Sequence, residues 1–179
     1  KVAIQPYLEQ IRDFKIFAYN VTEKVPWELR IQPKNKTLIN NALIDQVELF
    51  CMKKDRKMEV LFICGSAGAG KTKYAISFCD TKGLSYYVSS SSNDPLQDYK
   101  GEQVLILDDL TDKSFRYKDF MKLLDNNTRS SSTSRFRNKA FLGDLIIITT
   151  TINLDAWYFN ESSHDKHEMR RRIKTMVIM

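Results

Sequence analysis

One stretch constrains the fold of this chain more than any other: the apolar run EVLFIC at residues 59–64 passes directly into GSAGAGKTK at residues 65–73. A short apolar run that ends at a glycine is typical of a buried strand in a parallel sheet. The glycines that follow allow backbone conformations that residues with a Cβ atom reach only with strain. The segment KTKYAISFC, residues 71–79, predicts a helix that opens at this loop. A strand, a glycine-rich loop and a helix in this order can surround anionic oxygens with backbone N–H groups.

The loop itself fits the phosphate-binding pattern G-x-x-x-x-G-K-[ST] over residues 65–72 without a mismatch. Lys71 can reach the β- and γ-phosphates of a nucleotide, and Thr72 can offer its hydroxyl to magnesium, a hard ion that prefers oxygen ligands. ATP and Mg²⁺ are therefore the predicted cofactors. The predicted nucleotide-binding residues are Gly65, Ser66, Ala67, Gly68, Ala69, Gly70, Lys71, Thr72 and Lys73.

A pair of acids predicts the second part of the site. Asp108 and Asp109 follow four apolar residues in QVLILDDL, residues 103–110, and open α/β sheets bind ligands at the carboxyl ends of their strands. We expect Asp108 to hold magnesium through water, and Asp109 to accept the proton of the water that attacks the γ-phosphate. The alternative is an exposed acidic turn, which the position about 35 residues after a phosphate-binding loop disfavours.

The remaining apolar runs predict the rest of an α/β fold. LSYYVS (84–89), DLIIITTT (144–151) and KTMVIM (174–179) are further strand candidates, and FMKLLDN (120–126) is a helix candidate. Strands that alternate with helices are typical of an α/β fold, in which a parallel sheet is flanked by helices.

The N-terminal part predicts a separate helical segment. Apolar positions over residues 2–20 have helical spacing, the stretch 26–33 is turn-like between two prolines, and Thr37 is placed to cap a second helix. We therefore expect two domains, a helical segment at residues 1–56 that holds an oligomer together and a nucleotide-binding domain at residues 57–179.

Composition adds few constraints. The formal net charge of +6 is compatible with a nucleic-acid partner. The three cysteines are scattered, which favours free thiols in a reducing, intracellular compartment. No apolar run approaches the ~18 residues of a membrane span, so no membrane association is predicted. Because Lys1 is not a start methionine, we expect the chain to be a fragment that lacks an N-terminal partner domain.

Five segments in order, GSAGAGKT, QDYKGEQVLILDD, FMKLLDNNT, IIITTT and MRRRI, give the chain a family resemblance. Over about residues 60–179 it resembles the superfamily 3 helicase domain of replication initiator (Rep) proteins from rolling-circle plasmids and small single-stranded DNA viruses. The resemblance implies an AAA+ fold, a homo-hexameric ring that uses ATP and magnesium, and 3′-to-5′ movement on single-stranded DNA. It also implies a preceding nicking domain, whose His-hydrophobe-His signature is absent here, since the histidines are His164 and His167.

The resembling family carries a polar sensor at the end of a strand, usually Thr or Ser followed by Asn. Here the run is Thr149, Thr150 and Thr151, with Asn153 two places further on. Either Thr151 replaces the sensor, or the strand end bulges to present Asn153. Both side chains can form a hydrogen bond with the attacking water or the γ-phosphate.

The segment SRFRNKAF, residues 134–141, alternates Arg135, Arg137 and Lys139 with other residues. Period two suits a β-hairpin with its cations on one face. In the resembling family this segment projects into the channel of the ring and grips DNA, so these three residues are the predicted DNA contacts. The alternative is a solvated hairpin whose phenylalanines pack in the core.

The segment MRRRI, residues 169–173, places three arginines before the last apolar run. In ring ATPases such an arginine enters the site of the neighbouring subunit and stabilises charge on the γ-phosphate. Arg171 and Arg172 align best with the family pattern, and Arg170 less well. The alternative is a basic patch that faces solvent or DNA.

The sequence thus predicts an ATP-driven helicase motor. Two other functions remain open at this point: a nucleotide-gated assembly ATPase, of the loader or packaging type, that binds DNA without unwinding it, and a phosphotransfer kinase. Stimulation of ATP hydrolysis by single-stranded DNA distinguishes the first two from a kinase, and strand displacement on a forked duplex distinguishes the helicase from the assembly ATPase.

Overall fold

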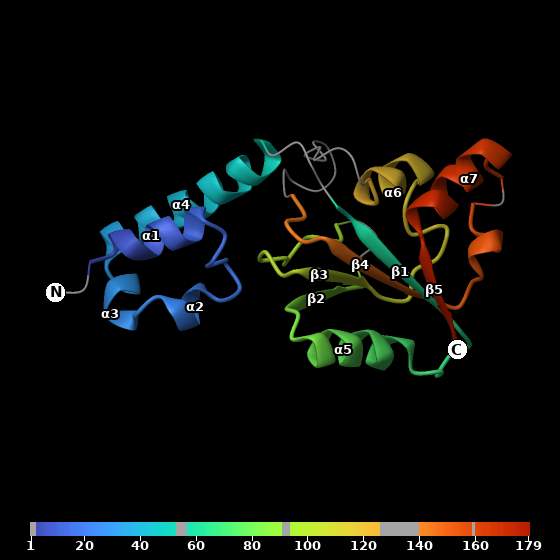
Figure 1. Ribbon diagram of the computed structural model, residues 1–179, viewed down its shortest axis with the longest axis horizontal. Helices are drawn as coiled ribbons and strands as arrows, with labels where there is room; N and C mark the ends of the chain where they lie inside the picture. The colour runs from blue at the N-terminus through green and yellow to red at the C-terminus, as the bar shows by residue number, and fades with distance from the viewer. Residues whose placement is uncertain (1–2, 53–56, 91–93, 126–139, 159) are drawn as a thin grey trace.

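A sheet of five strands organises the C-terminal part of the molecule (Figure 1). The computed structural model describes residues 3–52, 57–90, 94–125, 140–158 and 160–179. Along the sheet the strands have the order β2-β3-β4-β1-β5, and each neighbouring pair is parallel. Their bounds are β1 Glu59–Cys64, β2 Tyr86–Ser89, β3 Val104–Leu107, β4 Leu145–Thr150 and β5 Thr175–Ile178. The predicted parallel α/β sheet is confirmed.

Burial on both faces explains why the central strands read as unbroken apolar runs. All four residues of β3 are fully buried, as are Phe62 and Ile63 of β1. Successive side chains point to opposite faces. Leu61 and Ile63 pack in one hydrophobic cluster with helix α5, whereas Val60 and Phe62 pack in the other with helix α6. A strand covered on both sides has no polar face to interrupt its sequence.

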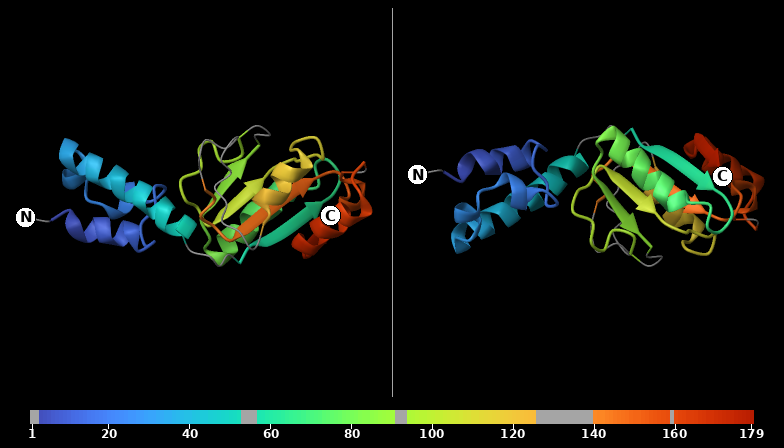
Figure 2. Two further views of the ribbon diagram at one scale, coloured as in Figure 1. Left: turned by 90° about the horizontal axis from the view of Figure 1, so that it is seen from above. Right: turned by 90° about the horizontal axis from the view of Figure 1, so that it is seen from below.

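Helices lie on both faces of the sheet (Figures 1 and 2). Helix α5, Lys71–Lys82, covers one face, and helices α6, Tyr117–Leu123, and α7, Ser163–Arg172, cover the other. The sequence analysis did not identify α7 as a helix. The Ser162 hydroxyl accepts the backbone N–H of Asp165 and caps its first turn.

The N-terminal helices form a unit with its own core beside the sheet (Figure 1). They are α1 Gln5–Arg12, α2 Val21–Lys24, α3 Trp27–Arg30 and α4 Pro33–Met52. Their shared core consists of Leu8, Ile11, Ile16, Val25, Leu29, Ile39 and Ala42. Among the helices in the described part of the chain, none combines the length and the apolar character needed to cross a membrane.

Three boundaries in this unit differ from the prediction. The helix expected over 2–20 ends at Arg12, because the chain turns at Phe14, whose φ of 60° is left-handed. The helix expected to be capped by Thr37 begins instead at Pro33, because proline is well accommodated at the first position of a helix. Thr37 therefore lies inside the helix, where its hydroxyl donates to the Pro33 carbonyl. The expected turn at 26–33 contains the short helix α3.

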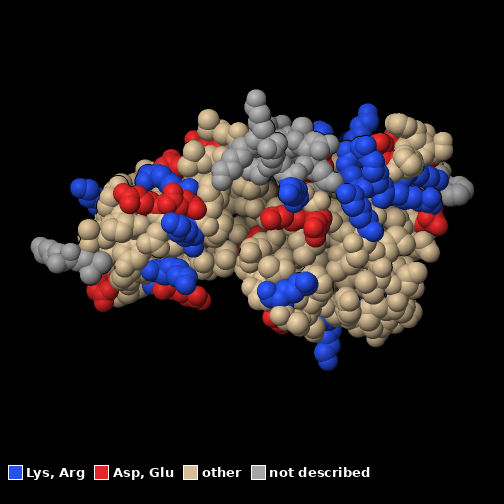
Figure 3. Space-filling view, viewed as in Figure 1, with Lys and Arg blue, Asp and Glu red and all other residues tan. Residues whose placement is uncertain are grey.

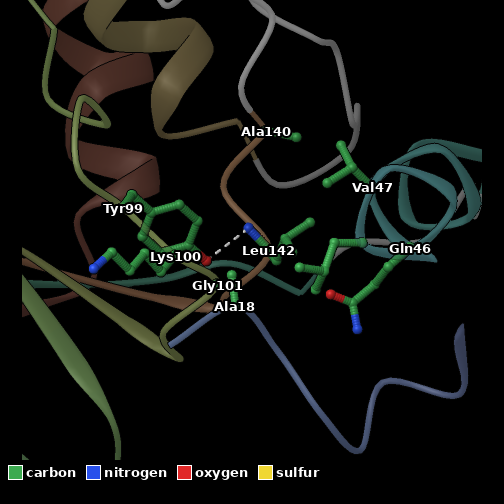
Figure 4. A pocket seen from close by; sticks show the side chains of 9 residues that line it. Ala18, Gln46, Val47, Tyr99, Lys100, Gly101, Ala140 and Leu142 are labelled. Atoms are coloured by element: carbon green, nitrogen blue, oxygen red, sulfur yellow. Dashed lines mark hydrogen bonds between the residues drawn. The ribbon is translucent and has the colours of Figure 1, made fainter. Parts of the chain in front are cut away.

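The helical unit contacts the sheet unit at the loop before β3. The backbone N–H of Tyr19 donates to the Lys100 carbonyl at 3.1 Å. Gly101 has a φ of 97°, and a Cβ atom there would lie 3.1 Å from the Phe17 ring. A small cavity lies at this junction (Figure 4), where the Tyr99 hydroxyl accepts the backbone N–H of Leu142 at 3.0 Å. The absence of a side chain at Gly101 permits the close approach of the Phe17 ring.

Candidate nucleotide-binding site

The glycine-rich loop begins where β1 ends, as the sequence predicts. The N–H of Gly65 donates to the Thr150 carbonyl at 3.2 Å, which ties the start of the loop to β4. Gly68 and Gly70 have φ values of 77° and 84°. A Cβ atom at either would meet nothing within 4 Å, so the left-handed backbone, not crowding, requires glycine here. Helix α5 begins at Lys71 directly after the loop, so its free N–H groups and positive dipole end are available to an anion.

Lys71 lies inside this loop. Its side chain is buried, with the residue 8% exposed, and its Nζ donates to the carbonyls of Gly65 at 3.0 Å and Ser66 at 2.9 Å. A buried ammonium held by loop carbonyls has a third donor left over. It can therefore meet phosphate oxygens that enter the loop. Lys73, by contrast, is exposed on the first turn of α5.

Hydroxyl and carboxylate oxygens meet beside the loop. The Thr72 hydroxyl donates to Oδ1 of Asp108 at 2.6 Å. Asp108 directly follows β3, and its own N–H donates to the Ser89 carbonyl at the end of β2. The two residues predicted to hold magnesium are thus in direct contact. Such an oxygen donor set fits Mg²⁺, which takes one or two protein oxygens and completes its shell with phosphate and water.

Asp109 lies beside this pair in an uncommon backbone conformation. It is exposed and has a φ of 50°, which costs a residue with a Cβ atom about 1–2 kcal/mol. Its N–H donates to the Thr149 hydroxyl at 2.9 Å, and the next N–H, of Leu110, donates to the Thr149 carbonyl at 2.9 Å. The turn therefore presents the Asp109 carboxylate to solvent at the carboxyl edge of the sheet.

The two candidate sensors of the γ-phosphate, Thr151 and Asn153, follow the end of β4. Asn153 caps a short 3₁₀ helix, Leu154–Ala156, where its Oδ1 accepts the N–H of Asp155 at 3.1 Å. Thr151 follows the strand and is exposed. The β4 hydroxyl that contacts the acid pair is that of Thr149, which donates to Oδ1 of Asp108 at 2.7 Å. The sequence analysis did not assign Thr149 a role.

Strand register could have identified Thr149. Leu107 lies opposite Ile148 in the parallel β3–β4 pairing, so the next residues along, Asp108 and Thr149, come level with each other. The pairing of β3 with β4 is the information that the sequence lacked, because it depends on the order of strands and not on either strand alone.

The arginines of α7 form ion pairs on its surface. Arg171 and Arg172 both pair with Glu168, at 2.9 and 3.4 Å, and Arg170 pairs with Asp155. Lys and Arg side chains gather over α6 and α7 (Figure 3). The Arg171 side chain is 60% exposed, so its ion pair contributes little to stability and can be exchanged at low cost, whereas the Arg172 side chain is only 19% exposed. The predicted DNA contacts Arg135, Arg137 and Lys139 lie outside the described residues.

Comparisons with known proteins agree with this geometry. A family described as RNA helicase matches residues 61–153, which run from β1 through the loop and the acid pair to the end of β4. This match covers more than half of the chain. The chain belongs to this RNA helicase family. Together with the two relatives described next, this match confirms the family resemblance indicated by the sequence motifs.

Two relatives of this helicase domain are replication proteins. The chain is 43% identical over 127 residues to the "Replication protein" of Onion yellows phytoplasma (strain OY-M), a match that covers 70% of this chain and 34% of the relative. It is 29% identical over 125 residues to the "Replication-associated protein" of Porcine circovirus 2, covering 70% of this chain and 38% of the relative. The matches thus span little more than a third of these relatives.

A chain in the closed-state cryo-EM reconstruction of Hsp104 with ATPγS and FITC casein aligns with 98% of this chain and 36% of its own length. The sequence identity is 17% and the TM-score 0.37.

Proposed function

We propose that this helicase domain binds ATP with magnesium between the glycine-rich loop and the acid pair, and hydrolyses it. The observation that carries the proposal is the 2.6 Å contact between Thr72 and Asp108. It joins two motifs that the chain keeps far apart in sequence, and it does so at the carboxyl edge of a parallel sheet, where such folds bind ligands.

Each residue of the site has a role that its position supports. The Lys71 ammonium turns from the loop carbonyls toward the β- and γ-phosphates, with the stronger hydrogen bonds that charged partners make. Thr72 and Asp108 hold Mg²⁺, which neutralises charge on the phosphates. The exposed carboxylate of Asp109 accepts the proton of the attacking water. Thr151 and Asn153, which follow β4 in the chain, remain candidates for sensing the γ-phosphate.

We further propose that hydrolysis drives a homo-hexameric ring along single-stranded DNA during replication. Both relatives are named as replication proteins, and the matched family is a helicase family. In this proposal residues 1–56 form the collar of the ring, Arg171 or Arg172 completes the site of the next subunit, and Arg135, Arg137 and Lys139 grip the strand. A nicking domain would belong to the longer protein, which would act inside the host cell.

One set of measurements tests the proposal in steps. Phosphate release is measured with Mg²⁺ and ATP, alone and with single-stranded DNA or single-stranded RNA of equal length. We expect DNA to stimulate hydrolysis and a forked duplex to be unwound. The Asp109→Asn variant is the matched control, because it keeps the shape of the side chain and loses the base. It should bind ATP but not hydrolyse it.

The outcomes separate the alternatives. Stimulation by RNA alone would identify RNA as the track. Stimulation by DNA without unwinding would favour an assembly ATPase of the loader or packaging type. A chain that releases no phosphate under any of these conditions, or an Asp109→Asn variant that turns over at the parental rate, would refute the assigned chemistry.

A further inference from the structure

Thr149 joins the two acids of the site. The residue is 1% exposed. Its hydroxyl donates to Oδ1 of Asp108 at 2.7 Å and accepts the backbone N–H of Asp109 at 2.9 Å. A buried hydroxyl is costly unless it is hydrogen-bonded. Both hydrogen bonds of the Thr149 hydroxyl are made to the acid pair of the candidate site.

The bonding capacity of these groups fixes their orientation. A threonine hydroxyl has one proton to donate, and because a backbone N–H can only donate, the Thr149 proton must point to Asp108. Oδ1 of Asp108 then accepts two hydrogen bonds, from the hydroxyls of Thr72 and Thr149, at 2.6 and 2.7 Å. Together they hold the carboxylate in one rotamer. None of the described residues donates to the other oxygen, Oδ2, which is left for a partner that comes with the nucleotide.

The same hydroxyl supports the turn at Asp109. A left-handed φ at a residue with a Cβ atom persists only where its surroundings hold it, and the N–H of Asp109 is held by Thr149. One side chain of β4 therefore sets both the direction of the metal-binding carboxylate and the position of the proton acceptor.

We infer that Thr149 is a positioning residue, which aims Asp108 at the magnesium ion of the nucleotide and Asp109 at the attacking water. This inference rests on the proposed ATP hydrolysis. Partners that orient a metal ligand in this way typically change metal affinity or activity about 10- to 100-fold when they are removed.

The neighbouring residue provides a matched control. Thr150 is also fully buried in β4, but its hydroxyl accepts the N–H of Ile152 in the turn that follows. Replacing either threonine by valine keeps the branched shape and removes the hydroxyl. The Thr149→Ser variant removes a methyl group and keeps the hydroxyl.

The test measures metal binding directly. Free Mn²⁺ is followed by electron paramagnetic resonance in the presence of ADP and the full chain. For Thr149→Val we expect about 10- to 100-fold weaker Mn²⁺ binding and unchanged affinity for ADP without metal. Phosphate release should need correspondingly more Mg²⁺, with a lower kcat at saturating metal. Thr149→Ser should restore both quantities, and Thr150→Val should keep the parental metal affinity.

Several results would overturn the inference. Thr149→Val with a cooperative thermal transition and parental Mn²⁺ affinity would do so, as would equal losses in Thr149→Val and Thr150→Val. If Thr149→Val does not fold, Thr149→Ser and Thr149→Ala are compared, and equal Mn²⁺ affinity in these two also overturns it. A parent chain that binds no ADP would instead refute the proposed nucleotide site.

Discussion

Two glycines at opposite ends of α5 allow the backbone requirement of the phosphate-binding loop to be measured. Gly70 precedes the helix with a φ of 84°, and Gly83 follows it with a φ of 65°. At both positions a Cβ atom would meet nothing within 4 Å. Gly70→Ala and Gly83→Ala therefore introduce the same kind of backbone strain without a steric clash, one in the loop and one at the far end of the helix.

The expected magnitude follows from this strain. A left-handed conformation costs a residue with a Cβ atom about 1–2 kcal/mol. The substitution also restricts the unfolded chain by about 0.4–1 kcal/mol, which offsets part of that cost. Each variant should therefore lose less than about 2 kcal/mol of folding free energy. If the alanine loop relaxes when empty, binding must restore the strained conformation, and nucleotide affinity falls about 5- to 30-fold.

Calorimetric titration with ADP and thermal unfolding of both variants provide the two quantities. We expect weaker ADP binding for Gly70→Ala and parental binding for Gly83→Ala, and a smaller loss of stability for Gly70→Ala, because a loop that relaxes when empty meets the strain on binding and not on folding. Parental affinity in Gly70→Ala would show that the left-handed backbone at this position is not needed for phosphate. Equal losses of affinity in both variants would assign the effect to α5 as a whole and refute the reasoning.

Three further predictions concern the charged residues. Lys71→Ala removes the ammonium from the loop and should abolish phosphate release and weaken ATP binding; near-normal turnover would contradict the loop assignment. Arg172→Ala should bind nucleotide but not hydrolyse it as a pure oligomer, and mixing with Lys71→Ala subunits should restore part of the activity; no rescue at any ratio argues against an arginine acting between subunits. Replacing Arg135, Arg137 and Lys139 by alanine should flatten the slope of log affinity for single-stranded DNA against log salt by up to about 2 units, whereas an unchanged slope places the DNA contacts elsewhere.

The sequence predicts those elements whose signal is local. The run 59–64 coincides with β1, and the helix predicted from residue 71 begins at Lys71. A strand buried on both faces is an unbroken apolar run, and a phosphate-binding loop has a fixed spacing of glycines, so both can be recognised without knowledge of any distant contact.

Elements that depend on tertiary contacts are missed or misplaced. Helix α7 has one buried residue, Met169, among ten mostly charged or polar ones, so no apolar period marks it. The local signal that the sequence offers for this helix is Ser162, a residue type that is favoured at helix N-caps. Conversely, apolar spacing extends beyond Arg12, but the left-handed turn at Phe14 ends α1, and Ile16 enters the core from an irregular segment. Apolar spacing shows which residues are buried, and it does not show where the backbone turns.

Strand β4 connects the parts of the site that the sequence shows only separately. It lies between β3 and β1, so it contacts both segments that face the nucleotide: the Thr150 carbonyl accepts the N–H of Gly65, and the Thr149 hydroxyl holds Asp108. The predicted DNA-binding segment at 134–141 comes shortly before β4 in the chain. Gly143 lies between that segment and β4 in the chain. It passes so close to the residue before β3 that a Cβ atom at this position would lie 2.2 Å from the Gln103 carbonyl oxygen. Because a tightly packed connection transmits displacement instead of absorbing it, we expect nucleotide binding at the end of β4 to be coupled to the predicted DNA contacts that precede this strand in the chain.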